Sequence, residues 1–251
     1  MAKFATRPGL FLAALLGMLF VAAPGLALLV RPIVINLTSS GSRANSSIEV
    51  VNDRNRAVAV EVKVNRLTLP ERGPPMVSAD PGKDFLIFPA IASIPAGGRQ
   101  VFRVRYIGDP ALAQSKLFMF SSSELPVAEN PTAKDAQIQV LYSIHSVVTV
   151  SPPKARPAIS VVGVERGKNA KGESGVFVTF RNDGPAHGFV NNAQFDLEVG
   201  SWSKKLEAAQ LGNVVGLGLI PANARRVMFI TMPDVPAVGQ LAGRIKVNSD
   251  N

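Results

Sequence analysis

The sequence contains no cysteine and only two histidines, His145 and His187. The absence of cysteine excludes a disulfide framework and thiol chemistry, so the fold must be held together by burial of apolar side chains. A transition-metal site has almost no nitrogen or sulfur ligands to draw on. Neither histidine lies in a context typical of a catalytic serine–histidine pair.

Phosphate-binding loops and paired catalytic carboxylates are also lacking. Gly216-Leu217-Gly218 has no third glycine, and we do not expect a helix to follow it, so it is not a dinucleotide-binding loop. The acidic residues are scattered, with no spacing that suggests an acid/base pair. We therefore expect a protein that is not an enzyme, with no catalytic residues, no cofactor, no metal and no small-molecule substrate.

The first 27 residues differ from the rest of the chain. Lys3 and Arg7 precede an apolar stretch, Gly9–Ala23, which ends in Pro24-Gly25-Leu26-Ala27. This pattern predicts a secretory signal peptide at residues 1–27, cleaved after Ala27. The alternative is an uncleaved anchor, because Gly9–Val30 carries no charge and is long enough to span a membrane.

The formal net charge is +9, but the lysines and arginines are scattered singly along the chain. Such a balance suits either a solvated basic surface or an acidic protein partner. The absence of basic runs and the expected export both argue against a nucleic-acid partner.

From Leu28 onwards, apolar residues alternate with polar ones over short segments separated by turn residues, which indicates an all-β fold. We expect Pro70–Lys83 to be a loop, and Ala208–Leu219 to be strand and loop rather than helix. The expected strands are Leu28–Leu37, Ser46–Val51, Ala57–Leu67, Phe85–Phe88, Gln100–Ile107, Lys116–Ser122, Ala136–Val150, Ile159–Glu165, Gly175–Arg181, Phe189–Val199, Ser201–Leu206, Val227–Met232 and Gly243–Val247.

The expected strand Ala136–Val150 is unusually long and uninterrupted. Its first half places Ile138, Val140, Tyr142 and Ile144 on one face, because side chains alternate along a strand. Such a strand is either buried at the centre of its own sheet or forms an edge that another molecule covers.

A proline-rich segment and an internal repeat divide the chain into two domains. Ser151–Pro157 contains three prolines, which a central strand cannot accommodate. The segment Ile94-Pro95-Ala96 recurs as Ile220-Pro221-Ala222, and each copy follows an Asn-Asp turn at similar spacing. We expect immunoglobulin-like β-sandwiches at residues 28–152 and 158–251, joined by a hinge at 153–157.

Several motifs in the first domain resemble those of the periplasmic chaperones of the chaperone–usher pilus assembly pathway. Asn52 stands where that family has an asparagine at the end of its second strand. The segment from Pro89 through Ile94-Pro95-Ala96-Gly97 to Gln100-Val101-Phe102-Arg103-Val104 is similar to the family signature. Lys116-Leu117-Phe118 followed by Glu124-Leu125-Pro126 resembles its next strand, and the long strand closing in Ser151-Pro152 resembles its last.

The resemblance implies a periplasmic protein that binds pilus or fimbrial subunits by donating an edge β-strand, and that delivers them to an outer-membrane usher. The subunit-binding residues would be Ile138, Val140, Tyr142 and Ile144. The same edge would also allow the free protein to self-associate. The alternative function is an exported structural or adhesive two-domain protein of the cell envelope or pilus.

The resemblance also implies a basic pair that anchors the subunit's terminal carboxylate. Arg31 is the candidate for the arginine of the first strand. The long strand departs from the family because it contains no lysine, and Lys154 and Arg156 lie beyond it in the hinge.

Overall fold

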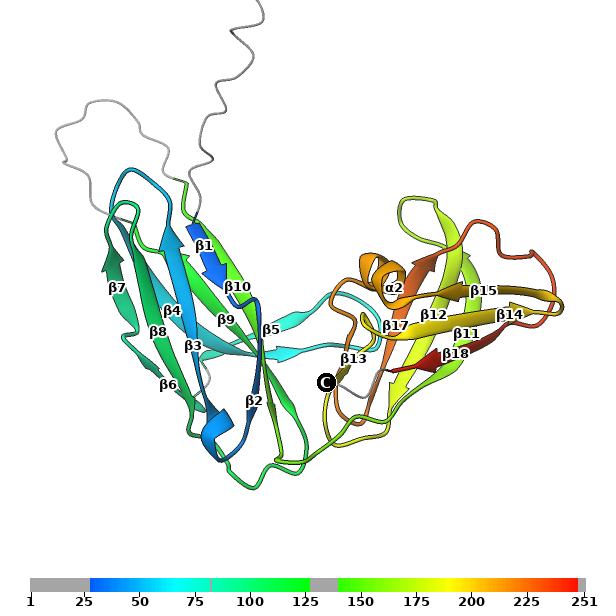
Figure 1. Cartoon of the computed structure of the whole chain (residues 1–251), viewed down its shortest axis with the longest axis horizontal. Coiled ribbons are helices and arrows are strands. Elements are labelled where there is room, and N and C mark those ends of the chain that lie inside the picture. The colour runs from blue at the N-terminus through cyan, green and yellow to red at the C-terminus, as the bar shows by residue number, and fades with distance from the viewer. Residues whose placement is uncertain (1–27, 82, 127–139, 248–251) are drawn as a thin grey trace, which may run out of the picture.

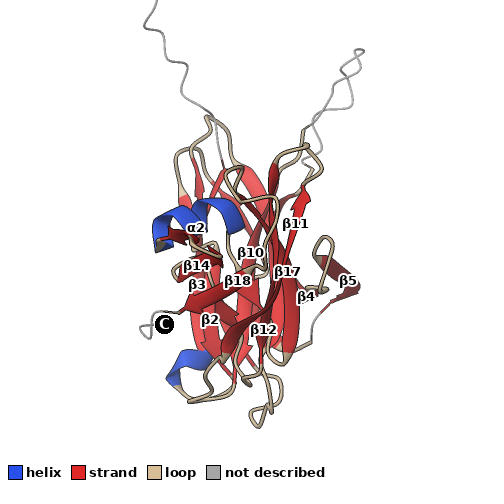
Figure 2. Cartoon of the chain, turned by 90° about the vertical axis from the view of Figure 1, so that its right-hand side faces the viewer, coloured by secondary structure: helices blue, strands red, loops and turns tan. Residues whose placement is uncertain are grey.

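The computed structural model describes residues 28–81, 83–126 and 140–247. They form two lobes built almost entirely of β-strands, with one α-helix in the second lobe (Figures 1 and 2). The strands of the first domain are β1 (Leu28–Arg31), β2 (Val34–Thr38), β3 (Asn45–Asn52), β4 (Val58–Thr68), β5 (Met76–Pro81), β6 (Phe85–Phe88), β7 (Ile91–Ile94), β8 (Arg99–Tyr106), β9 (Lys116–Glu124) and β10 (Ser143–Ser151).

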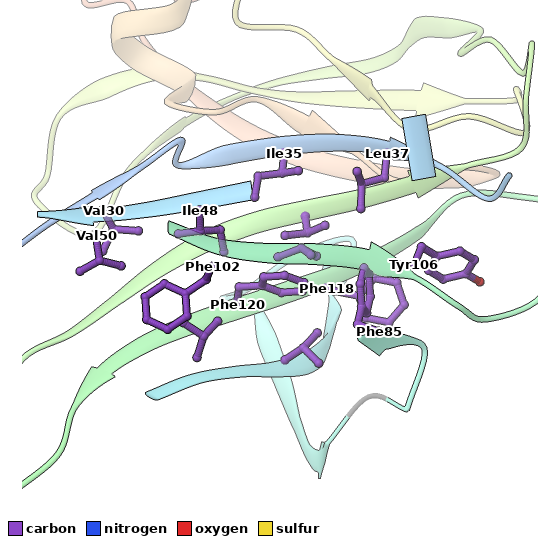
Figure 3. Packing of buried hydrophobic residues seen from close by; sticks show 14 of the residues in the cluster. Val30, Ile35, Leu37, Ile48, Val50, Phe85, Phe102, Tyr106, Phe118 and Phe120 are labelled. Carbon is purple, nitrogen blue, oxygen red and sulfur yellow. The ribbon is translucent and has the colours of Figure 1, made fainter. Parts of the chain in front are cut away.

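Two sheets form the sandwich of the first domain. One has the order β1-β3-β8-β6, and the other has the order β2-β10-β9-β4-β5 with β7 paired to β4. Most even-numbered residues of β3 and β8 are buried between the sheets and the odd-numbered ones face outwards, as the alternation predicts. Phe85 packs into the core with its ring edge-on to Phe118 and Phe120, at 4.9 and 5.0 Å between ring centroids (Figure 3).

The expected first strand, Leu28–Leu37, is two strands in different sheets. β1 pairs with β3, whereas β2 pairs in parallel with β10. Pro32 follows β1 and has no N–H to continue a ladder. The buried positions change from even (Leu28, Val30) to odd (Ile35, Leu37) across this break, so the continuous-strand prediction was wrong.

The strands of the second domain are β11 (Ile159–Lys168), β12 (Ser174–Asn182), β13 (Gly188–Phe189), β14 (Gln194–Val199), β15 (Trp202–Leu206), β16 (Leu219–Ile220), β17 (Ala224–Thr231) and β18 (Ala242–Lys246). Sheets β11-β12-β17 and β15-β14-β18 enclose a second, separate core that includes Phe180, Phe195 and Leu197, all fully buried. The chain is therefore a two-domain, immunoglobulin-like β-sandwich protein.

The segment expected to be strand and loop at Ala208–Leu219 instead begins with α2 (Ala208–Val215). The valines and glycines of this segment suggested otherwise, but Glu207 and Gln210 form a reciprocal capping box that starts the helix. Leu211 anchors the helix in the core, and Gly216, at a φ of 61°, ends it. Among the described residues, no helix is long and apolar enough to cross a membrane.

The expected loop Pro70–Lys83 contains a further strand, β5. It pairs with the end of β4 through a register shift between Asn65 and Leu67. This irregularity also turns Leu67 to the outer face of its sheet, where it is buried against the second domain. The prolines and glycines of the segment are concentrated in the turn before β5, which explains why the strand was missed.

The repeated Asn-Asp turns occupy equivalent positions in the two domains. Asn52 and Asn182 are fully buried, and each side chain ties its own turn to the repeated Ile-Pro-Ala segment. The Nδ2 groups donate to the carbonyls of Arg56, Ile94 and Pro95 in the first domain, and of Ala186 and Pro221 in the second. The repeat therefore reflects the need to satisfy the same buried backbone groups twice.

Candidate functional site: an open strand edge beside the domain interface

One edge of β10 is paired for only part of its length. The whole strand pairs antiparallel with β9, but β2 pairs with it only from Val147 onwards. The Glu124 N–H donates to the Tyr142 carbonyl, so the even-numbered residues of β10 exchange hydrogen bonds with β9. The N–H and C=O groups of Ser143 and His145 therefore point towards the opposite side, where no described strand pairs with them.

The predicted subunit-binding residues lie at or before the start of this edge. Ile138 falls outside the described residues, and the strand expected from Ala136 begins in the structure at Ser143. Val140 and Tyr142 precede the strand and are 60% and 50% exposed. Ile144 is partly buried and packs against the core of its own domain, since it shares a face with buried Val148.

The outer face of this sheet, which points towards the second domain, is polar near the open edge. Pairs of side chains from β9 and β10 bond across the strands. Ser123 and Ser143 are 2.8 Å apart at their hydroxyl oxygens, and the Ser121 hydroxyl lies 3.0 Å from Nδ1 of His145. His145 is thus an exposed, hydrogen-bonded strand residue.

A buried ion pair fixes the place where the chain enters this strand. Arg54 Nη1 donates to both carboxylate oxygens of Glu124 at 2.9 Å, and the two side chains are 8% and 1% exposed. Arg56 adds a second contact to the same carboxylate. The Arg54 guanidinium lies under the Tyr142 ring, 4.8 Å from its centroid, while its Nη2 has no hydrogen-bond partner among the described residues.

Next to the part of β10 that pairs with β2, the two domains share a small apolar contact. It buries Leu67 and Leu117 of the first domain against Leu219 of the second. The partly buried residues packed against these three are Leu69, Met119, Val147, Phe189 and Leu217. This contact holds the second domain against the outer face of β4 and β9.

A hydrogen-bonded cluster next to the apolar contact joins the end of β10 to the second domain. The Ser115 and Ser151 hydroxyls are 2.7 Å apart, and the backbone N–H of His187 donates to Ser115 at 3.0 Å. Nδ1 of His187 lies 3.0 Å from the Ser151 hydroxyl. Burial lowers the pKa of His187 to about 4, so the imidazole is neutral at physiological pH.

The turn between β4 and β5 reaches across to the second domain (Figure 1). The backbone N–H of Val227 in β17 donates to the Glu71 carbonyl at 2.8 Å. Arg72 lies 3.6 Å from a Glu165 carboxylate oxygen and 5.9 Å from the centroid of the Phe177 ring. The hairpin is therefore a second contact between the domains. It lies at the β5 edge of the sheet, far from β10.

Arg31, the candidate carboxylate anchor, does not point into the space between the domains. It lies on the outer face of the other sheet, where Nε donates to Glu49 at 2.7 Å. The break at Pro32 is the physical reason, because it leaves β1 in the sheet that faces away from the second domain. Arg31 therefore lies in the sheet that does not contain the open edge of β10, and its role as a carboxylate anchor stays a prediction.

Two clusters could not be predicted from the sequence: the ion pair of Arg54 and Glu124, and the hydrogen-bonded group of Ser115, Ser151 and His187. Their partners lie 70 and 36 or more positions away in the chain, so no local spacing could have paired them.

The fold and the site thus define a two-domain β-sandwich protein with an open strand edge next to the domain contact. Known proteins show the family to which it belongs. Residues 30–155 match the family described as "Pili and flagellar-assembly chaperone, PapD N-terminal domain". The chain belongs to this family of pilus-assembly chaperones. No curated protein sequence matches it.

Solved structures of similar fold include several chaperones. The class 5 fimbriae chaperone CfaA shares 12% identity over 88% of this chain and 100% of its own, with a TM-score of 0.53. The Escherichia coli chaperone DraB shares 16% identity over 86% of this chain and 89% of its own, with a TM-score of 0.50. A chain of the chaperone–tip adhesin complex of CFA/I fimbriae shares 11% identity over 88% of this chain and 99% of its own, with a TM-score of 0.52. At these identities the likeness concerns the fold alone.

Proposed function

We propose that this pilus-assembly chaperone acts in the periplasm, binds pilus or fimbrial subunits along the open edge of β10, and passes them to an outer-membrane usher. The observation that carries the proposal is the one-sided pairing of Ser143–Ser146. A subunit strand placed there would meet unpaired N–H and C=O groups in the geometry of a sheet. The exposed Val140 and Tyr142 would add apolar contact where the strand begins. The family match supports the subunit role.

The domain boundaries belong to the same proposal. We place the subunit-binding domain at residues 28–152, the hinge at 153–157 and the second domain at 158–251. Support comes from the two separate cores, since the residues of the first lie between Leu28 and Val150 and those of the second between Ile159 and Val247.

The experiment tests whether capture depends on the backbone N–H of the open edge or on its side chain, using two substitutions of His145. His145→Pro removes an N–H that faces the open side and leaves the hydrogen bonds of the even-numbered residues with β9 in place. His145→Val replaces the imidazole with an apolar side chain and keeps the N–H. Each variant is co-expressed with an exported, β-rich subunit encoded beside the chaperone gene, and the recovered one-to-one complex is measured.

We expect His145→Pro to weaken subunit capture by about fivefold or more, since a backbone hydrogen bond contributes about 1 kcal/mol, and His145→Val to retain capture. Unfolding midpoints of both variants verify that the domain is intact. Equal capture by both variants would show that the open edge does not bind the subunit.

A further inference from the structure

The outer face of the sheet β1-β3-β8-β6 points away from the second domain and carries an unusual mixture of side chains. The strand register aligns them in cross-strand rows: Leu29, Val51 and Arg99; then Arg31, Glu49 and Val101; then Ser47, Arg103 and Phe88; and finally Asn45, Arg105 and Leu86. We call this surface the arginine face.

The arginine face has an excess of positive charge. Its four strands carry four arginines and a single carboxylate, Glu49. Arg31 and Arg99 share that carboxylate, at 2.7 and 3.7 Å. Arg103 and Arg105 form no ion pair with any described residue, so their charges are available to a partner.

Apolar side chains lie exposed between these arginines. Phe88 is 70% exposed and stands opposite Arg103, while Leu86 is 57% exposed and stands opposite Arg105. Leu29 and Val101 are exposed in the other two rows. Leu86 and Phe88 lie two residues apart on the same face of β6, so together they offer apolar surface to a partner.

A groove runs between the free arginines and these apolar side chains. It is lined by Asn45, Ser46, Ser47, Leu86, Phe88, Arg103, Val104 and Arg105. The lining contains hydroxyl, amide and guanidinium donors but no carboxylate. This set of groups suits a phosphate, which arginine binds with two parallel hydrogen bonds.

We propose that the arginine face binds the surface of a membrane that contains anionic phospholipid. The face carries four arginines and one carboxylate, and the groove offers donors that suit phosphate, so an anionic lipid surface complements both its charge and its hydrogen-bonding groups. At a membrane surface the guanidinium groups can meet lipid phosphates while Phe88 and Leu86 enter the apolar boundary. A second copy of the chain is a poor occupant, because its net charge of +9 would repel this face.

Membrane binding by this face would leave the open edge of β10 accessible. The open edge belongs to the other sheet, whose outer face meets the second domain. A chaperone held in this way could receive subunits as they emerge from the membrane. The inference goes beyond the proposed function and does not depend on it, since lipid binding is measured without any subunit.

The experiment measures binding of the purified protein to vesicles by flotation. Vesicles of phosphatidylcholine with about 30% phosphatidylglycerol are compared with vesicles of phosphatidylcholine alone, at low and high salt. The test variant is the double substitution Arg103→Gln and Arg105→Gln. The matched control is Arg181→Gln with Arg225→Gln, which removes the same charge from a cross-strand arginine pair of the second domain.

We expect binding to the phosphatidylglycerol vesicles alone, lost at high salt. The Arg103/Arg105 variant should bind about 30-fold more weakly, from about 1 kcal/mol for each basic residue at an anionic surface. The Arg181/Arg225 variant should bind like the wild type. Phe88→Ser should weaken binding about tenfold, because a partly inserted phenylalanine contributes roughly 1.5 kcal/mol.

Three results would overturn the proposal: no vesicle binding by the wild type, equal binding to both kinds of vesicle, or equal losses in the two arginine variants. The first would leave a protein partner as the occupant of the face. The last would show that only the overall charge of the protein matters. Unchanged unfolding midpoints are expected for the variants, since all the substituted side chains are at least partly exposed.

Discussion

Acidification should destabilise the protein through His187, the buried imidazole at the domain interface. Burial lowers the pKa of His187 to about 4 in the folded protein, whereas an unfolded histidine titrates near 6.5. The unfolded state therefore takes up the proton first as the pH falls. The stability contributed by the neutral imidazole is fully present above about pH 6.5 and is lost progressively as the pH falls towards 4.

The magnitude follows from the two pKa values. Between pH 7 and pH 5 the linkage amounts to about 2 kcal/mol of unfolding free energy. The perturbation that isolates it is His187→Asn, whose side-chain amide can still bond to the serine hydroxyls but does not titrate. His145→Asn is the control, because His145 is the only other histidine and lies exposed on β10.

Urea unfolding at pH 7, 6 and 5 measures the effect, with fluorescence of Trp202, the single tryptophan, as the signal from the second domain. Carboxylates titrate alike in all three proteins, so the difference between wild type and His187→Asn reports His187 alone. We expect this difference to shrink by about 2 kcal/mol from pH 7 to pH 5. A difference that stays constant across this range would refute the assignment of a buried, neutral His187.

Three further predictions concern stability and can be measured by urea unfolding at neutral pH. Glu124→Ala should cost about 3–5 kcal/mol, because it leaves the buried Arg54 guanidinium without its carboxylate; a loss below about 1 kcal/mol would contradict this. Asn182→Ala should cost about 2–3 kcal/mol by leaving the carbonyls of Ala186 and Pro221 without their donor, whereas Asn45→Ala, at an exposed site, should cost less than about 0.5 kcal/mol. Leu67→Ala and Leu219→Ala should each cost about 2 kcal/mol and show a coupling of at least about 0.5 kcal/mol in a double-mutant cycle, since they meet across the domain contact; additive losses would mean that the domains do not pack there.

Much of the fold could be predicted from the sequence because burial alternates along most strands. Val58, Val60, Val62 and Val64 all face the core, as their spacing indicates. The repeated Asn-Asp turns located equivalent positions of the two domains. Both signals are local, because each can be recognised in a short stretch of neighbouring residues.

The sheet to which a strand belongs is not a local property, so it could not be predicted from the sequence. Nothing in the pattern of Leu28–Leu37 shows that Pro32 sends its two halves to different sheets, yet this break decides where Arg31 points. The open edge of β10 depends likewise on β2, which starts pairing only at Val147. Family resemblance indicated that this strand matters, but which of its residues lack a neighbour could be learned only from the structure.

The parallel pairing of β2 with β10 also constrains the order in which the protein can fold. The Thr149 hydroxyl donates to the Asn36 side chain, and these two residues are 113 positions apart. If the chain crosses a membrane from its N-terminus, β2 emerges early but has no partner until β10 has followed. We expect the first domain to fold only after nearly all of its own sequence has been exported, and comparatively slowly, because contacts so distant in sequence form late. Until then, β2 remains without its partner strand, and the sheet of the first domain has an unpaired edge.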